Sequence, residues 1–343
     1  MITELAFPIA DVPPDPAGGL AYRRVVDTRN PKAAYHYRIV IPTTWLPVAV
    51  PAIPPTSEAP LQVLGLLRDP EDRRAEIEIL GVQMDREVGA VDWLDILLAE
   101  RGETILTRRS LDARLGPVPD VLTLLATPEG AIVSRWLVLK DGPHFFVLHA
   151  RAHEADYPRF AQVFLAAMQG LAPLHLSSWP LAELFRPYSR RDPGDYLLLH
   201  PDSWILTEDR SNNEDVHGLD LINLLHGDAV GRITVVTIAR SREPDPQGIA
   251  AKYVARVNLL GVDVAGLDLS PAPPAKAFDR TWTARASALR DNLEIRVVVG
   301  ERPDAWFLIA LMGASRRAAP ELWAINKRAH ELVVELLRTP AIE

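Results

Sequence analysis

The sequence predicts an α+β protein in which one domain occurs twice, head to tail. Two observations support this prediction. A strand ending in Pro-x-x-Trp occurs at Pro42/Trp45 and again at Pro201/Trp204, where the two tryptophans are 159 residues apart. The same order of a strand, a helix, a hairpin and a closing helix then follows each pattern, as expected for a long-period internal repeat. A chain of 343 residues also exceeds the usual size of a single core.

The first strands of the two copies are Tyr35 to Ile41 and Asp195 to His200, and each stops at its proline. A second strand follows, with Ile77, Ile79 and Leu80 matching Ile233, Val235 and Val236. The apolar spacing of Val91, Leu94, Leu97 and Leu98 predicts a helix, as does that of Ile249, Tyr253, Val257 and Leu260. Gly102 and Gly261 follow these helices as left-handed residues.

A hairpin comes next in each copy, with turns at Asp141–His144 and Glu301–Asp304 whose prolines, Pro143 and Pro303, are 160 residues apart. The closing helices begin at Pro158 and Pro320, since proline is favoured in the first helical turn. We therefore expect an N-terminal arm over 1–34, a first domain over 35–172, a connector over 173–193 and a second domain over 194–343. The apolar connector is expected to pack across both domains.

The composition excludes several classes of protein. The chain has 48% hydrophobic and 24% charged residues, no cysteine and a net charge of −8. Disulfides, thiolate catalysis and a broad nucleic-acid footprint are therefore not expected. The first residues lack the basic start of a signal peptide, and no apolar run reaches the ~18–20 residues of a membrane span. We expect a cytoplasmic protein without stable membrane insertion.

The order of elements, with Pro42-x-x-Trp45 and Pro201-x-x-Trp204, resembles the PsbP/DcrB-like (Mog-type) family over about residues 35–172 and 194–338. The resemblance implies an antiparallel sheet with helices on both sides, a PsbP-like α/β/α sandwich. It also implies that the protein binds other proteins or apolar segments and catalyses no reaction. One bacterial branch of the family consists of cytoplasmic chaperones that shield the hydrophobic helices of type VI secretion effectors. Those chaperones are usually single domains that act in pairs, so a fused pair could resemble their dimer.

The best-known enzyme motifs are absent from the sequence: there is no P-loop, no dinucleotide-binding glycine motif, no Gly-x-Ser-x-Gly and no His-Glu-x-x-His. His149 and His153 share one face of a strand, but no third ligand has a useful spacing. We therefore predict no catalytic residue, no metal site and no cofactor. A deep pocket with titratable groups near His149 or His226 would instead indicate an enzyme of unrecognised type.

The hairpin strands supply the candidate residues for binding a partner. With the offset of 160, Trp136 corresponds to Arg296, and both are expected on the face opposite to Leu293, Ile295, Val297 and Val299. The returning strands are apolar on both faces, with Phe146 and Trp306 among their residues, so they are either sandwiched between layers or form an apolar groove. The predicted partner-binding residues are Trp136, Phe146, His149, Arg296 and Trp306.

The sequence thus predicts a non-enzymatic chaperone or adaptor whose partner is a protein, with hydrophobic or transmembrane helices of an effector as the expected client. A scaffolding or oligomerisation protein is the alternative, and light scattering separates the two because a strict monomer excludes the scaffold.

Overall fold

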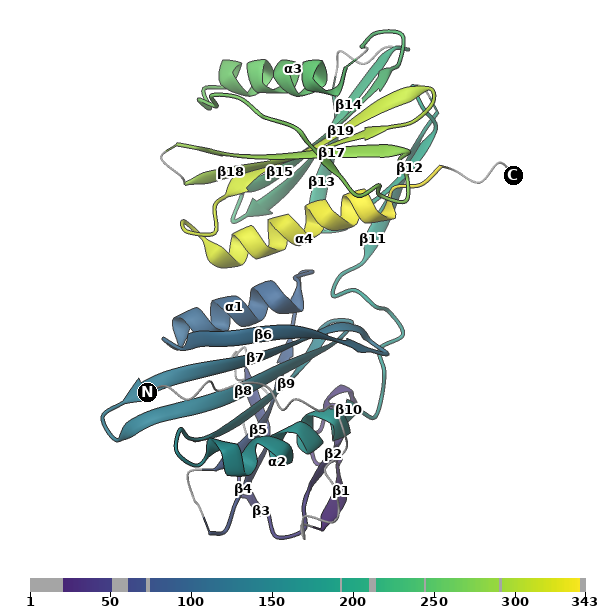
Figure 1. Cartoon of the computed structure of the whole chain (residues 1–343). Coiled ribbons are helices and arrows are strands. Elements are labelled where there is room, and N and C mark those ends of the chain that lie inside the picture. The colour runs from purple at the N-terminus through teal and green to yellow at the C-terminus, as the bar shows by residue number, and fades with distance from the viewer. Residues whose placement is uncertain are drawn as a thin grey trace. The chain divides into compact units, whose positions relative to one another are not determined.

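A computed structural model describes residues 21–50, 61–71, 75–191, 193–209, 214–243, 245–289 and 292–339. The chain divides into two compact units: residues 1–85 with 90–182, and residues 86–89 with 183–343. Each unit contains a seven-stranded antiparallel sheet (Figure 1). The prediction of two α+β copies is confirmed. The finer predicted division into arm, domains and connector stays a prediction, and residues 1–20 of the arm lie outside the described residues.

The sheet of the first unit has the strand order β3-β4-β5-β9-β8-β7-β6. Its strands are β3 (Leu46–Val48), β4 (Gln62–Arg68), β5 (Glu76–Gln83), β6 (Thr104–Ala113), β7 (Gly116–Thr127), β8 (Gly130–Asp141) and β9 (His144–His153). Helix α1 (Ala90–Glu100) lies on one face and α2 (Tyr157–Gly170) on the other (Figure 1). A small sheet is formed by β1 (Tyr22–Asp27), β2 (Tyr37–Pro42) and β10 (Ala172–Pro173), and a short 3-10 helix spans Ala33–Tyr35.

The second unit repeats this arrangement with the strand order β13-β14-β15-β19-β18-β17-β16. Its strands are β13 (Trp204–Glu208), β14 (Val216–Leu225), β15 (Asp228–Ala239), β16 (Ser270–Ala272), β17 (Arg280–Ala288), β18 (Leu293–Glu301) and β19 (Ala305–Ala314). The helices α3 (Pro246–Leu259) and α4 (Pro320–Leu336) lie on opposite faces, and β11 (Phe185–Arg190) pairs with β12 (Tyr196–Pro201).

The alternation of side chains along each strand gives the second unit an apolar core on each face of its sheet and the first unit an apolar core on the α2 face. In the second unit Phe307 and Ile309 pack in the core on the α4 face, whereas Trp306 and Leu308 pack in the core on the α3 face. Trp45 and Trp204 are buried at 2% exposure, in the cores that contain α2 and α4. The two Pro-x-x-Trp tryptophans are therefore core residues.

The hairpin offset of 160 is wrong by one residue. Trp136 is paired with His149 in the first hairpin, and Val297 is paired with Ala310 in the second. When the two hairpins are aligned by their strand pairing and by the faces of their strands, each residue of the first hairpin corresponds to the residue 161 positions later. Trp136 therefore corresponds to Val297. The error arose because Pro143 and Pro303 occupy different positions in their turns. A shift of one residue exchanges the two faces of a strand.

Candidate functional site

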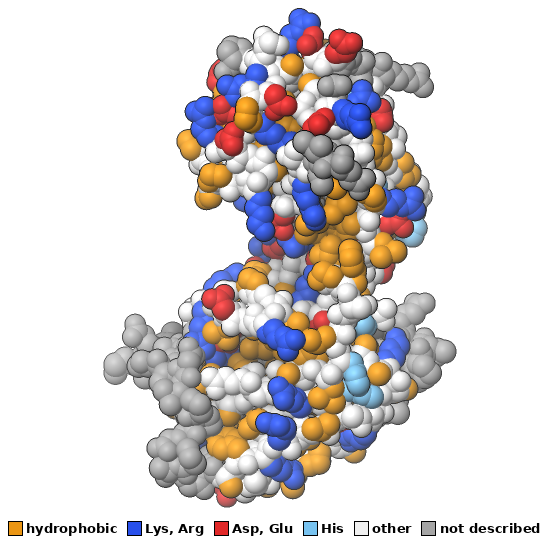
Figure 2. Space-filling model, turned by 90° about the vertical axis from the view of Figure 1, so that its right-hand side faces the viewer, with side chains coloured by type: hydrophobic (Ala, Val, Ile, Leu, Met, Phe, Trp, Pro, Cys, Tyr) orange, Lys and Arg blue, Asp and Glu red, His pale blue; other side chains and the backbone are white. Residues whose placement is uncertain are grey.

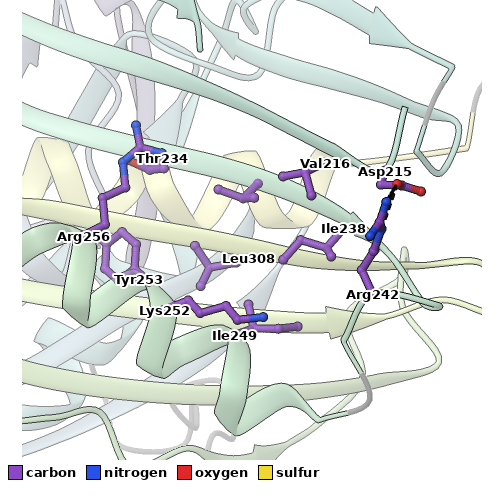
Figure 3. A pocket seen from close by; sticks show the side chains of 11 residues that line it. Asp215, Val216, Thr234, Ile238, Arg242, Ile249, Lys252, Tyr253, Arg256 and Leu308 are labelled. Atoms are coloured by element: carbon purple, nitrogen blue, oxygen red, sulfur yellow. Dashed lines mark hydrogen bonds and ion pairs between the residues drawn. The ribbon is translucent and has the colours of Figure 1, made fainter. Parts of the chain in front are cut away.

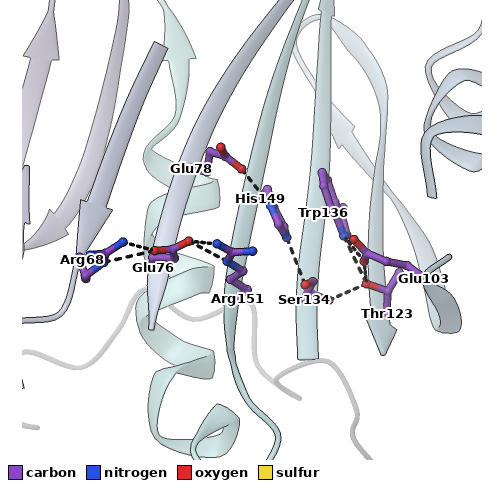
Figure 4. Close-up of polar contacts among 9 residues, drawn as sticks. All are labelled: Arg68, Glu76, Glu78, Glu103, Thr123, Ser134, Trp136, His149 and Arg151. Atoms are coloured by element: carbon purple, nitrogen blue, oxygen red, sulfur yellow. Dashed lines mark hydrogen bonds and ion pairs between the residues drawn. The ribbon is translucent and has the colours of Figure 1, made fainter. Parts of the chain in front are cut away.

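A row of polar side chains crosses the α1 face of the first sheet (Figure 4). Nδ1 of His149 lies 3.2 Å from Oε2 of Glu78, and Nε2 lies 3.1 Å from the Ser134 hydroxyl. The rings of His149 and Trp136 are stacked at 3.7 Å between centroids. The indole N–H of Trp136 then donates to Glu103 at 2.9 Å, and the Thr123 hydroxyl also donates to Glu103. The row thus runs through strands β5, β9, β8 and β7.

The order Ser134, His149 and Glu78 is that of a nucleophile, a base and an orienting acid. Burial lowers the pKa of His149, outweighing the opposing effect of Glu78. Burial alone would raise the pKa of Glu78, but the hydrogen bond to His149 and nearby positive charges lower it. A neutral imidazole that donates to an ionised Glu78 and accepts from Ser134 satisfies all three groups.

Catalysis by these residues would require that a substrate reach the hydroxyl oxygen of Ser134, and Ser134 is only 3% exposed. Neither the cavity of about 270 Å³ in the first unit nor that of about 510 Å³ in the second includes Ser134 or His149 in its lining. His226 is an exposed turn residue and lines neither of these cavities. The side chains of the polar row satisfy one another's hydrogen bonds within a buried layer, as buried polar groups in folded proteins do.

The part of this face that lies next to the polar row is charged. Glu76 on β5 accepts from Arg68 at 2.9 Å and from Arg151 at 2.7 Å. The two arginines also line a cavity of about 270 Å³ together with His153 and Glu129. Because each cation has a carboxylate partner, this half of the first sheet presents ion pairs to water.

Three predicted partner-binding residues lie in the first unit, and all three are buried. Trp136 is 0% exposed because it is covered by the stack with His149 on one side and by Arg101, whose guanidinium carbon lies 5.0 Å from the ring centroid. Phe146 lies on the opposite face, in the α2 core beside Tyr35. The structure therefore brings Trp136 and His149 together but separates both from Phe146.

The other two predicted residues lie in the second unit and are also buried. Arg296 is on the α4 face, where it pairs with Glu294 and lies 5.4 Å from the ring centroid of Trp323. Trp306 is on the α3 face, with its indole N–H donating to the Glu243 carbonyl at 2.8 Å. The expectation that Trp136 and Arg296 share a face is wrong: the counterpart of Arg296 is Arg135, which is bonded to Asp120 in the α2 layer.

The second unit contains a groove that no single motif in the sequence marked. It lies between α3 and strands β14, β15 and β19, has a volume of about 510 Å³ and is shown in Figure 3. We call it the α3 groove. Its apolar lining consists of Val216, Val236, Ile238, Ile249, Tyr253 and Leu308. Burial raises the pKa of Tyr253 to about 12, so its hydroxyl stays neutral.

The local sequence fixes α3 as one wall of the groove. Asp245 caps the helix by accepting from the Gln247 N–H at 3.2 Å, and Pro246 fills the first helical turn. Past the end of the helix, the chain returns along α3. Gln247 donates to the Leu267 carbonyl at 2.7 Å, and the Val264 N–H donates to Asn258 at 2.9 Å. These bonds hold α3 over β18 and β19 and away from β14.

The two copies differ at three neighbouring positions on this face of the sheet. Glu78, His149 and Trp136 stand side by side across β5, β9 and β8. Their counterparts by face and pairing are Thr234, Ala310 and Val297. At these three positions the first copy has hydrogen-bonding or charged side chains, whereas the second has Thr234 and two apolar side chains. Sequence reasoning did find one signal for the groove, because the returning strand that includes Leu308 was expected to be sandwiched or to form an apolar groove.

Figure 2 shows the charged side chains on one face of the molecule. On the face shown in Figure 2, Lys and Arg side chains are interspersed with acidic and apolar ones. None of the helices in the described part of the chain is both long and apolar enough to cross a membrane. The described residues also include no group of three or more His, Asp or Glu side chains placed to hold a metal ion.

No family model and no curated protein matches the chain. Among solved structures, it is similar to cyanobacterial PsbP (CyanoP) from Synechocystis sp. PCC 6803, with a TM-score of 0.34, 13% identity and coverage of 46% of this chain and 94% of that one. It is also similar to the T6SS immunity protein TplEi from Pseudomonas aeruginosa complexed with "L" peptide, with a TM-score of 0.23, 12% identity and coverage of 88% and 95%. The apo form of TplEi gives a TM-score of 0.22. Similarities at this level define no function.

Proposed function

We propose that this protein is a non-enzymatic binding protein that holds an apolar helix of a protein partner in the α3 groove. In the cell it would act as a chaperone or adaptor, with a type VI secretion effector as the client that the family resemblance suggests. The observation that supports this proposal is the groove itself, about 510 Å³ in volume and lined by Val236, Ile238 and Leu308.

The dimensions of the sheet favour a helix as the occupant. Helix α3 packs on β18 and β19 and leaves strands β13, β14 and β15 beside it on the same face. Three strands at ~4.8 Å spacing measure roughly 10 Å between the outer two, about the diameter of one helix. Ile205 and Ile222 stand opposite each other on this face, and Ile205 is 50% exposed. The face therefore has the width for one additional helix, with apolar side chains at both ends of β14 and the ion pair of Asp220 and Arg232 between them.

Burial of apolar side chains would supply the affinity. Each Leu, Ile or Phe of the client that enters the groove contributes about 1.5–3 kcal/mol of gross burial. Ordering of the complex consumes part of this gain. Two or three such anchors suit a chaperone, which must release its client.

The test uses the purified full chain and a neutral, Leu-rich amphipathic helical peptide with a fluorescent label. Fluorescence anisotropy should show saturable binding, and Val236→Asp should weaken it at least tenfold because a carboxylate cannot lose its hydration without a partner. Leu225→Asp is the matched control, since Leu225 is 43% exposed and lies at the other end of β14 from Val216. Circular dichroism checks that both variants fold. Equal affinity of the two variants would contradict the proposal.

A further inference from the structure

The cations at the rim of the α3 groove are arranged along one wall and its adjoining turn (Figure 3). Lys252 and Arg256 are four residues apart on α3, so their side chains lie on one face of the helix about 6 Å apart along its axis. Arg242 extends this row at the end of β15. All three side chains line the groove.

Each of these cations has a carboxylate partner, and the partners of Lys252 and Arg256 are the more buried members of their pairs. Lys252 pairs with Glu243, Arg256 with Asp209 at 2.9 Å, and Arg242 with Asp215, which accepts from its Nε at 2.8 Å. The side chains of Lys252 and Arg256 are 66% and 47% exposed, whereas those of Glu243 and Asp209 are 10% and 22% exposed. In these two pairs the cation faces the solvent and the carboxylate lies behind it, whereas Asp215, at 36% exposure, lines the groove beside Arg242.

The exposure of these cations determines which side chains of a client can form ion pairs at the groove. An ammonium has three donors and a guanidinium has five, so a cation held by one carboxylate can bond to a second. An acidic side chain of the client would meet these exposed cations directly. A basic side chain beside Lys252 and Arg256 would meet these cations first, because Glu243 and Asp209 lie behind them.

We infer that the client helix is amphipathic and carries acidic side chains, three or four residues apart, along the edge that faces α3. This inference rests on the proposed function and adds the charge of the client to it. It differs from a fully apolar transmembrane helix, which would leave the exposed row of cations without new partners.

The test uses three labelled peptides with the same Leu face. Their edge positions carry Glu at i and i+4, Ser at the same positions, or Lys. We expect affinities in the order Glu, Ser, Lys, with a factor of about 2 to 5 for each exposed ion pair. The preference should fade at about 0.5 M salt, which screens exposed charges.

The double variant Lys252→Glu/Arg256→Glu should reverse the order, so that the Lys peptide binds more tightly than the Glu peptide. Arg285→Glu/Arg317→Glu is the matched control, because both positions are exposed in the same unit and line no part of the groove. The control should keep the original order.

The outcomes separate the two proposals. If the Ser peptide binds and is weakened by Val236→Asp, but all three peptides bind equally, the function stands and the acidic client is excluded. If no peptide binds, the groove function itself fails.

Binding of the full chain to vesicles of phosphatidylglycerol would overturn the inference in favour of an anionic lipid surface, provided that Lys252→Glu/Arg256→Glu abolishes it. Vesicles of phosphatidylcholine serve as the neutral control for this measurement.

Discussion

The indole of Trp136 and the imidazole of His149 lie face to face, with 3.7 Å between centroids and 9° between planes. Each ring is also held at its edge, since His149 contacts Glu78 and Ser134 while Trp136 donates to Glu103. The stack covers both rings, which is why a tryptophan expected as a binding anchor is a buried part of the sheet.

Replacing Trp136 with Phe should destabilise the first unit by about 1–3 kcal/mol, because Glu103 and Thr123 lose a buried donor. Urea denaturation of the two proteins measures this difference. Trp179→Phe is the control, since Trp179 is 43% exposed. An unchanged free energy of unfolding for Trp136→Phe would show that these hydrogen bonds contribute nothing.

A fluorophosphonate probe should fail to label Ser134 in the folded protein. Ser134 is only 3% exposed, and its hydroxyl is hydrogen-bonded to His149 within the buried polar row. A known serine hydrolase in the same reaction is the positive control, and mass spectrometry is the readout. Labelling of Ser134 that His149→Ala abolishes would contradict a non-enzymatic function and would identify Ser134 as a nucleophile.

Acidification should destabilise the second unit through His330. Burial lowers the pKa of this group to about 4, against 6.5 in the unfolded chain, and its Nε2 donates to the Ile309 carbonyl at 3.1 Å. Between these two values the unfolded state binds more protons, so stability falls as pH falls. At pH 4.5 the loss relative to pH 7 should be about 2–3 kcal/mol.

The matched variant for this prediction is His330→Gln, which keeps a donor for the Ile309 carbonyl but cannot titrate. Urea denaturation at the two pH values gives the comparison. The wild-type protein should lose more stability than the variant on acidification, and equal losses would assign the pH dependence to other groups.

Gly300 should not tolerate a side chain. A Cβ added there would lie 2.4 Å from Cγ of Phe278, which belongs to the α4-face core. Gly300→Ala should therefore cost about 1–3 kcal/mol through overpacking. Gly266→Ala is the control, because nothing lies within 4 Å of its added Cβ. Thermal unfolding should show a lower transition temperature for Gly300→Ala only.

The sequence was sufficient to predict the duplication and the order of the elements. Strong periodicity marked α1 and α3, and the turns at Gly142 and Pro303 located both hairpins. It was insufficient for the assignment of faces. In strands that are apolar on both sides, such as β9 and β19, the alternation of side chains does not distinguish the two faces. Aligning the two turn prolines shifted the comparison by one residue, and Trp136 was therefore assigned to the wrong face of the sheet.

The groove could not be predicted in detail for a related reason. Its lining comes from α3, β14, β15 and β19, which are distant in sequence, and its openness depends on where α3 lies across the sheet. Bonds such as Gln247 to the Leu267 carbonyl set that position. No local pattern encodes a contact of this kind, whereas the apolar character of Val236 and Leu308 is visible in the sequence.

The ion pairs of Glu76 with Arg68 and Arg151 have a consequence for how the protein behaves at high concentration. Well-hydrated charges on an open sheet face oppose self-association, whereas an apolar groove promotes it. The first unit therefore carries paired charges on its sheet face, and the second unit carries an apolar groove on its own sheet face. Under the proposed function, the charged unit would counter the self-association that the groove of the attached second unit promotes.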